Sequence, residues 1–233
     1  QPVTCRERER LHMSIQQQVQ AVRARMAAAA ESSGRRPEDI ALCAATKVQT
    51  DDTIRAAIAG GITVCGENRV QEMVQKLEQH AYDGAPLHFI GHLQRNKVKQ
   101  VVGHVALIQS VGSLELLDEI EKVAAARGLV QDILLEVNIG REAAKSGFAP
   151  EKVLPAAEAA LERTHVRVRG LMTIPPADAQ RDANFRYFQE VQALYVDMNQ
   201  KLFHNELEYL SMGMSGDYED AIRAGATMVR VGS

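Results

Sequence analysis

The residue with the clearest chemical potential is Lys47, which directly follows the unbroken apolar run from Ile40 to Thr46. Such a run, with a polar segment and a helix-like stretch after it, is typical of a parallel strand covered on both faces. The carboxyl ends of these strands carry the chemistry of α/β folds. A partly desolvated lysine there can lose its proton and attack a carbonyl group. The plainer interpretation is a lysine at the rim of the fold that forms a salt bridge. Residues near the C-terminal end of the chain favour a chemical role for Lys47 instead.

A second group of candidate residues lies in the segment Ser211–Asp217 and at the end of the chain. The segment reads Ser-Met-Gly-Met-Ser-Gly-Asp and leads into a predicted helix. Its backbone N–H groups and the hydroxyls of Ser211 and Ser215 suit a phosphate dianion, with Gly232 and Ser233 as further donors. Barrel proteins often bind phosphate in the loops after strands seven and eight. The plainer interpretation is that the glycines shape a turn and a polar side chain caps the helix.

Together, a strand-end lysine and a phosphate cup predict a phosphorylated carbonyl compound bound as a Schiff base. A barrel aldolase that acts on a sugar phosphate and a pyridoxal 5'-phosphate (PLP) protein both fit. Arg230 favours the second, because it would lie below the phosphate cup, where the pyridine nitrogen would fall. An arginine stays protonated, so it would donate to that nitrogen and weaken the ring as an electron sink. The alternative for Arg230 is a salt bridge with Glu136 inside the barrel.

The rest of the chain predicts a scaffold that brings these residues to one face. Eight strand-like runs are found at 40–46, 62–65, 87–90, 106–108, 133–137, 166–172, 208–211 and 227–231. Helix-like segments fill every gap, at 51–59, 69–80, 95–102, 114–127, 150–161, 183–202 and 217–224, and a further helix opens the chain at 11–33. This alternation favours parallel strands with right-handed crossovers. We predict an α/β fold, a single (β/α)8 TIM-type barrel with an additional N-terminal helix.

Composition limits the classes of function. The 233 residues, 45% of them apolar, suit one domain over 11–233, and residues 1–10 are predicted to be a disordered start or a remnant of cloning. A net charge of −3, the absence of Trp and the lack of a long apolar run predict no nucleic-acid or membrane partner. Three cysteines without a C-x-x-C pair predict no metal site and a reducing, cytoplasmic location. A barrel that buries its own core is expected to be a monomer.

Several ordered segments resemble the pyridoxal phosphate homeostasis protein family. The His-Phe-Ile-Gly-x-Leu-Gln-x-Asn-Lys and Ser-Met-Gly-Met-Ser stretches are highly specific for it. The matching segments are Ala45–Lys47, Gly66–Glu72, His88–Lys97, Lys145–Gly147, Arg169–Ile174, Leu210–Ser215 and Val229–Ser233. The resemblance implies a single barrel similar to the N-terminal domain of bacterial alanine racemase.

The resemblance also implies roles for individual residues. Lys47 matches the lysine that forms the internal aldimine, and Arg230 matches the arginine that faces the pyridine nitrogen. Asn68 matches a residue near the ring hydroxyl or the lysine. Ser215 and the pair Gly232 and Ser233 match the phosphate-binding positions, and Ser211 lies in the same motif. Met172 and Met214 match apolar walls of the pocket.

This chain departs from the family pattern in three places. Ser233 stands where the family usually has Thr, which keeps the hydroxyl and the backbone donor. His92 stands where several relatives carry Pro, and we expect it to be a solvated loop residue, the alternative being an acid or base. The family continues with a short apolar and basic tail beyond the position of Ser233, and its loss would weaken the phosphate cup.

The function implied by the resemblance is PLP binding for the homeostasis of this form of vitamin B6, by storage or delivery, without established turnover. The implied partners are PLP and, beyond it, PLP-dependent apoenzymes or B6-metabolising enzymes. A weak PLP-dependent amino-acid racemase is the first alternative, and the sugar-phosphate aldolase is the second. A racemase needs acid–base groups on both faces of the cofactor, and Tyr209 is the nearest second candidate in the sequence. We therefore predict a PLP carrier rather than an enzyme.

Overall fold

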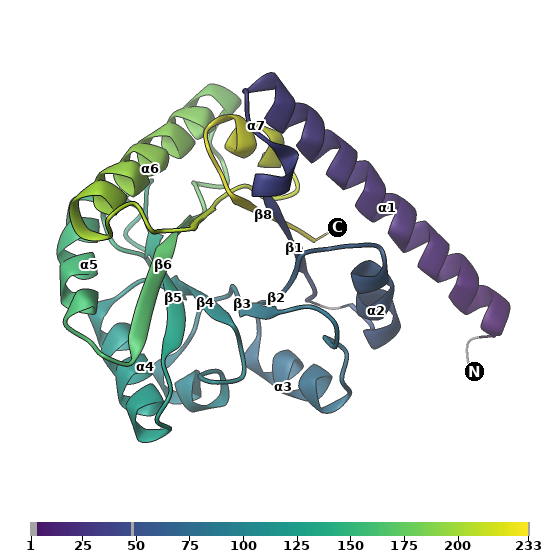
Figure 1. The fold of residues 1–233 in the computed structure, drawn as a ribbon, viewed down its shortest axis with the longest axis horizontal. Coiled ribbons are helices and arrows are strands. Elements are labelled where there is room, and N and C mark those ends of the chain that lie inside the picture. The colour runs from purple at the N-terminus through teal and green to yellow at the C-terminus, as the bar shows by residue number, and fades with distance from the viewer. Residues whose placement is uncertain (1–3, 48, 233) are drawn as a thin grey trace.

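A computed structural model describes residues 4–47 and 49–232 and contains a closed barrel of eight parallel strands (Figure 1). The strands pair in chain order, and β1 also pairs with β8, which closes the sheet. The predicted (β/α)8 barrel with an N-terminal helix is therefore confirmed. The strands are β1 Ala41–Ala45, β2 Val64–Glu67, β3 Leu87–Phe89, β4 Leu107–Val111, β5 Gln131–Val137, β6 Val166–Thr173, β7 Tyr209–Ser211 and β8 Met228–Val231.

Helices surround the barrel and cover the outer faces of the strands (Figure 1). The α-helices are α1 Cys5–Ser32, α2 Asp51–Ala59, α3 Val70–Glu78, α4 Leu114–Ala126, α5 Val153–Leu161, α6 Arg181–Leu202 and α7 Tyr218–Arg223. In the gap between β3 and β4 the predicted helical segment is a 3-10 helix, Arg95–Gln100. Val98 and Val101 in and after it are fully buried, and a 3-10 helix places residues three apart on the same side.

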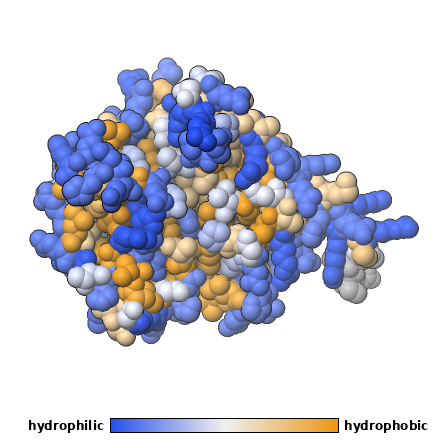
Figure 2. Space-filling model, viewed as in Figure 1, coloured by the Kyte–Doolittle hydropathy of each residue, from blue (hydrophilic) through white to orange (hydrophobic). Residues whose placement is uncertain are grey.

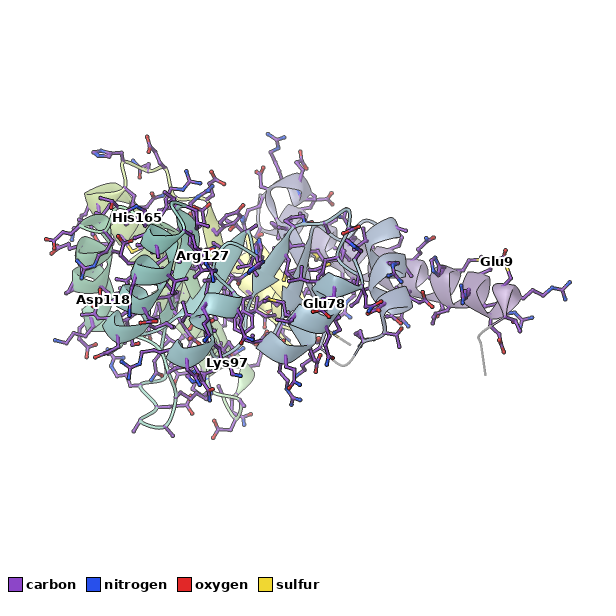
Figure 3. All side chains as sticks on the ribbon, turned by 90° about the horizontal axis from the view of Figure 1, so that it is seen from below. Glu9, Glu78, Lys97, Asp118, Arg127 and His165 are labelled. Atoms are coloured by element: carbon purple, nitrogen blue, oxygen red, sulfur yellow. The ribbon has the colours of Figure 1, made fainter. Side chains whose placement is uncertain are left out.

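The helix α1 begins earlier than the sequence pattern predicted. Thr4 and Glu7 form a capping box in which each side chain accepts a hydrogen bond from the other residue's backbone N–H. Residues 5–10 are thus helical, so the expectation of disorder does not hold for them, and the alternative of a cloning-derived start stays a prediction. This end of α1, with Glu9, projects beyond the barrel (Figure 3). The predicted helix is confirmed over 11–32, and Val19 and Met26 are among the residues that it buries.

The core has two layers, one outside the strands and one inside the barrel. The outer layer, between strands and helices, contains most of the buried apolar side chains. The inner layer is smaller and consists of two clusters, Cys43, Val64, Ile90 and Met228 in one and Leu107, Leu134 and Met172 in the other. Hydrophilic residues cover the projecting part of α1, whereas apolar residues show as patches over the barrel (Figure 2). Within residues 4–47 and 49–232, no helix has the length and apolar character needed to cross a bilayer.

Candidate functional site

The carboxyl ends of five adjacent strands, β6, β7, β8, β1 and β2, bring the predicted site residues together. Lys47 lies two residues beyond β1 and Asn68 directly follows β2. Gly232 follows β8, and the pairing of Ala44 with Val231 places it beside the end of β1. Ser215 lies in the loop after β7. Ser233 lies outside the described residues, so its predicted phosphate contact stays a prediction.

The side chain of Lys47 is exposed, whereas the sequence led us to expect partial burial. Its main chain is nevertheless held through the preceding residue. The backbone N–H of Thr46 donates to the carbonyl oxygen of Gly66 over 2.8 Å, and its hydroxyl oxygen lies 3.0 Å from the same oxygen. Thr46 itself is 3% exposed. The exposed amine of Lys47 is therefore attached to a main chain that hydrogen bonds hold in place at the barrel mouth.

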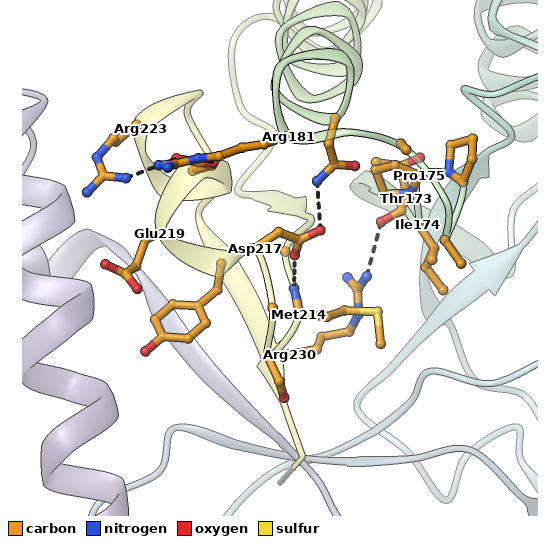
Figure 4. A pocket seen from close by; sticks show the side chains of 18 residues that line it. Thr173, Ile174, Pro175, Arg181, Met214, Asp217, Glu219, Arg223 and Arg230 are labelled. Atoms are coloured by element: carbon orange, nitrogen blue, oxygen red, sulfur yellow. Dashed lines mark hydrogen bonds and ion pairs between the residues drawn. The ribbon is translucent and has the colours of Figure 1, made fainter.

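The loop after β7 is shaped by its own hydrogen bonds. The backbone N–H of Met214 donates to Asp217 Oδ1 over 2.7 Å, and Asn184 Nδ2 donates to Asp217 Oδ2 over 2.9 Å (Figure 4). The backbone N–H of Gly232 donates to Ser215 Oγ over 3.3 Å. Asp217 thus holds the loop and makes no side-chain capping bond to α7. The loop is therefore a shaped turn, as the plainer interpretation predicted. The same backbone is also the predicted phosphate cup, so the two interpretations do not exclude each other.

The interior of the barrel holds Arg230, which is 3% exposed. Its Nη1 donates to Ser211 Oγ, and its Nη2 donates to the carbonyl oxygen of Thr173 over 3.0 Å (Figure 4). Burial lowers the pKa of Arg230, and the nearby Cys43, Glu136 and Asp217 oppose that shift. An arginine remains protonated in proteins even so. Within the described residues Arg230 forms no direct salt bridge with Glu136, the alternative considered above, although the two opposite charges still favour each other.

A chain of buried side chains continues behind Arg230. Ser211 Oγ donates to Gln109 Oε1 over 2.6 Å, and Gln109 Nε2 lies 2.9 Å from His88 Nδ1. Burial lowers the pKa of His88 to about 4, so its ring is neutral near pH 7. Ser211 is fully buried and bonded on both sides. This differs from the predicted role of Ser211 as a phosphate ligand, and its position suits support of Arg230.

The remaining predicted residues line the space around the barrel mouth. Met172 is fully buried in the inner layer, so it lies deeper than a pocket wall. Met214 is 45% exposed and lines a cavity of about 720 Å³ together with Ser215, Thr173 and Arg230. Figure 4 shows this cavity between the loop after β7 and the segment that follows β6. That segment contributes Pro175, Pro176 and Ala177 to the lining of the cavity.

The side chain of Asn68 has a buried hydrogen-bond acceptor that no donor among the described residues satisfies. Its Oδ1 is buried and has no hydrogen-bond partner. The loop after β3 packs so closely on its backbone that a Cβ on Gly91 would lie 2.1 Å from the Asn68 carbonyl oxygen. Glycine is therefore required at position 91, and the position of Asn68 depends on it. An unpaired buried acceptor is costly, so a donor from a bound molecule would satisfy it.

An acidic side chain, Glu136, stands at the same mouth. Burial raises its pKa, and the charge of Arg230, the proximity of His92 and a hydrogen bond from Ser146 oppose the shift. Lys145 acts in the same direction. His92 is exposed, which confirms the expectation of a solvated loop residue.

These residues fit a PLP-sized molecule by the chemistry of their donors. Lys47 supplies an amine, and Arg230 is a cationic donor fixed in the interior. Gly232 N–H and Ser215 Oγ lie together at the loop side, and Asn68 presents an unpaired acceptor. PLP has groups that match each of these, an aldehyde, a ring nitrogen, a phosphate and a ring hydroxyl.

Sequence reasoning missed several residues of this site. His88 and Gln109 received no role, although His88 lay in a quoted motif, and Asp217 was considered only as a helix cap, which it is not. The signal was present for Gln109, since a polar residue in an otherwise apolar strand needs a partner. No sequence signal connects Asn184 on α6 to the loop after β7, because that contact depends on tertiary packing.

Comparison with known proteins agrees with the fold and identifies the family of the chain. Residues 15–233 match the family described as "Alanine racemase, N-terminal domain". The pyridoxal phosphate homeostasis protein of Aquifex aeolicus is 42% identical over 209 residues, covering 90% of this chain and 91% of that protein. The protein of the same name from Pseudomonas aeruginosa is 36% identical, with 94% of each chain covered. PipY of Synechococcus elongatus, in a structure with PLP bound, has a TM-score of 0.77 at 29% identity and covers 91% of this chain and 97% of its own.

Proposed function

The chain belongs to the pyridoxal phosphate homeostasis protein family, and we propose that it binds PLP as a Schiff base on Lys47 for intracellular PLP homeostasis. PLP is bound in the related PipY structure, which supports the cofactor. The observation that carries the proposal is the fixed donor pair of Arg230 inside the barrel, below the cavity that Ser215 and Met214 line. When bound, PLP supplies an aldehyde that an amine can hold reversibly.

Each residue of the site has a part in this proposal. Ser215 and the backbone of Gly232 bind the phosphate, with Ser233 as a further donor. Asn68 accepts from the ring hydroxyl through its unpaired Oδ1. Arg230 donates to the ring nitrogen, Met214 covers the ring, and Ser211 and Met172 hold the floor of the barrel beneath it. Because the guanidinium of Arg230 can donate but not accept a hydrogen bond, it favours a ring nitrogen that stays unprotonated.

The same geometry favours holding the cofactor over turning over an amino acid. Tyr209, the nearest candidate for a second acid–base group, begins β7 and so lies toward the amino ends of the strands. Its ring packs 5.5 Å from the guanidinium carbon of Arg169. Lys47 stands at the opposite end of the barrel. A carrier passes its cofactor to PLP-dependent apoenzymes or exchanges it with B6-metabolising enzymes, and the cysteine pattern keeps the cytoplasm as the proposed location.

The proposal is tested by adding PLP to the purified protein and to a Lys47→Ala variant. We expect an absorption band distinct from that of free PLP with the parent protein and none with the variant. Borohydride reduction fixes an imine, so the parent should then carry the cofactor covalently on the peptide that contains residue 47. Lys152→Ala is the matched control, because Lys152 is also an exposed lysine.

Two results would contradict the proposal. A parent protein whose spectrum is that of free PLP would remove the Schiff base, and the sugar-phosphate aldolase would then be tested with sugar phosphates. Turnover of an amino acid faster than with free PLP would identify the protein as an enzyme. That reaction would need a second acid–base group, for which Glu136 is the first residue to replace.

A further inference from the structure

A buried carboxylate lies between the proposed site and the helix behind it. Glu67, the last residue of β2, is fully buried. Its Oε2 accepts hydrogen bonds from Thr46 Oγ1 at 3.0 Å, Lys76 Nζ at 3.1 Å and Tyr82 OH at 2.9 Å. Its Oε1 accepts from the backbone N–H of Asn68 at 3.1 Å. One side chain thus joins β1, β2, α3 and the segment after α3.

The cation in this cluster is buried as well. Lys76 on α3 is 7% exposed, and its Nζ also donates to the carbonyl oxygen of Thr46 over 2.7 Å and to Glu72 Oε2 over 3.3 Å. Buried charges are costly unless they are paired and hydrogen-bonded, and this pair meets both conditions. Burial, followed by the charge of Glu67, raises the pKa of Tyr82, so its phenol remains a donor. We define Glu67, Lys76 and Tyr82 as the Glu67 cluster.

The cluster acts on the two proposed cofactor residues through their main chain. The Thr46 carbonyl that Lys76 holds belongs to the peptide bond leading to Lys47. The N–H that Glu67 holds is that of Asn68 itself. The exposed amine of Lys47 has a long, flexible stem, so the direction in which it leaves the main chain decides where the amine can reach. Fixing that direction before binding saves ordering entropy on binding.

We propose that the Glu67 cluster is a positioning unit that aims Lys47 and Asn68 at the same bound molecule. This inference rests on the proposed function, because it assumes that Lys47 forms the Schiff base. The proposed function assigns none of the three residues a contact with the cofactor. Their effect is therefore largest on the bond that Lys47 makes, smaller on the contact of Asn68 with the ring hydroxyl, and absent at the phosphate contacts of the loop after β7.

Two ligands that differ at one group separate this effect from general support of the fold. PLP carries the aldehyde, and pyridoxine 5'-phosphate has the same ring and phosphate with an alcohol in its place. We compare the dissociation constants of both for the parent and for Glu67→Gln/Lys76→Met, which removes the two charges together. We expect PLP affinity to fall about tenfold or more, as for other supporting side chains behind a ligating group, with pyridoxine 5'-phosphate affinity changed less than about threefold.

Two further variants complete the comparison. Tyr82→Phe removes one donor to Glu67 and little volume, so it gives a smaller loss of PLP preference and decides the question if the double variant does not fold. Asp197→Asn/Lys201→Met makes a similar change at an exposed ion pair on α6 and should alter neither affinity.

The outcomes distinguish the inference from its premise. A parent protein without preference for PLP over pyridoxine 5'-phosphate would overturn the proposed Schiff base and the positioning unit together. A parent with that preference, alongside folded variants that keep it, would overturn the positioning unit alone. Equal losses for both ligands would also overturn it, because they would show that the cluster supports the pocket as a whole. A selective loss for PLP, graded from the double variant to Tyr82→Phe, would establish it.

Discussion

Arg230 can only donate hydrogen bonds, and this property sets the direction of each bond behind it. Ser211 Oγ accepts from Arg230 and must therefore give its own proton to Gln109 Oε1. The amide of Gln109 then presents its NH2 group to His88 Nδ1, which has to accept. His88 is thereby fixed as the neutral tautomer with its proton on Nε2. A guanidinium at the site dictates the protonation of an imidazole three side chains away.

The buried, neutral ring of His88 predicts that the free energy of unfolding depends on pH. Its pKa lies at about 4 in the folded protein and at an ordinary value of 6.5 when unfolded. A depressed pKa contributes stability above pH 6.5, and that contribution is lost as the pH falls toward 4. A shift of this size corresponds to about 3 kcal/mol between pH 7 and pH 4. Urea unfolding at intervals across this range measures the loss.

The matched variants isolate the contribution of His88 from that of the carboxylates. His88→Asn keeps an acceptor near the position of Nδ1 and cannot titrate, so its stability should fall by about 3 kcal/mol less than that of the parent between pH 7 and pH 4. His104→Asn, at an exposed histidine, should follow the parent. Identical pH profiles for the parent and His88→Asn would mean that the buried ring is not neutral.

At the scale of elements, α1 divides into an anchored part and a projecting part. The side chains that it buries are Val19, Met26, Ala29 and Ala30, all in its second half. The turns before Ile15 are held by the capping box and their own hydrogen bonds, whereas Ile15 packs against the core, and the end of the helix projects beyond the barrel (Figure 3). Its contribution to the fold is therefore local.

Removal of residues 1–10 should accordingly leave the barrel intact. We expect the free energy of unfolding to change by less than about 0.5 kcal/mol, as for surface changes, and the helical circular dichroism signal to decrease. Met26→Ala, in the anchored part, should cost about 2 kcal/mol or more, because it opens a cavity against the barrel. A comparable loss from the truncation would show that the projecting part packs on something in solution.

The limits of sequence reasoning are clearest at the level of elements. The eight strands and the helices between them follow from apolar runs and helical spacing, and they are found within a few residues of the predicted bounds. The start of α1 was missed because a charged, solvated helix has no apolar stripe, although Thr4 and Glu7 carried the capping signature. The 3-10 helix after β3 was missed because residues three apart share a side in both kinds of helix.

At the site, sequence reasoning succeeded where a strand end fixes a residue and failed where a contact is tertiary. Lys47, Asn68 and Gly232 stand where parallel strands must place them. Ser211 was taken for a phosphate ligand because a motif does not show that the strand pattern turns its side chain inward. The partners of Glu67 come from three separate segments, so only the folded chain reveals them.

For the molecule as a whole, the site lies across the seam that closes the barrel. β1 and β8 pair from Ala41 with Met228 to Ala44 with Val231, and the proposed cofactor residues stand on both sides of this seam. A closed sheet has no free edge, so opening either strand breaks the closure. A molecule bound across the seam must therefore be released before the barrel can open there.

This linkage predicts that PLP protects strands that it does not touch. At a PLP concentration one hundred times its dissociation constant, the folded state gains about 2.7 kcal/mol, or about a hundredfold in the rate of exchange through global unfolding. Amides of β4 and β5, which lie on the far side of the ring from the seam, should slow by the same factor as those of β1 and β8 (Figure 1). Hydrogen exchange with and without PLP measures both sets, and Lys47→Ala, which binds more weakly, should show less slowing in both. Slowing confined to β1, β2, β7 and β8 would mean that the two ends of the chain open as a separate unit while the middle strands stay folded.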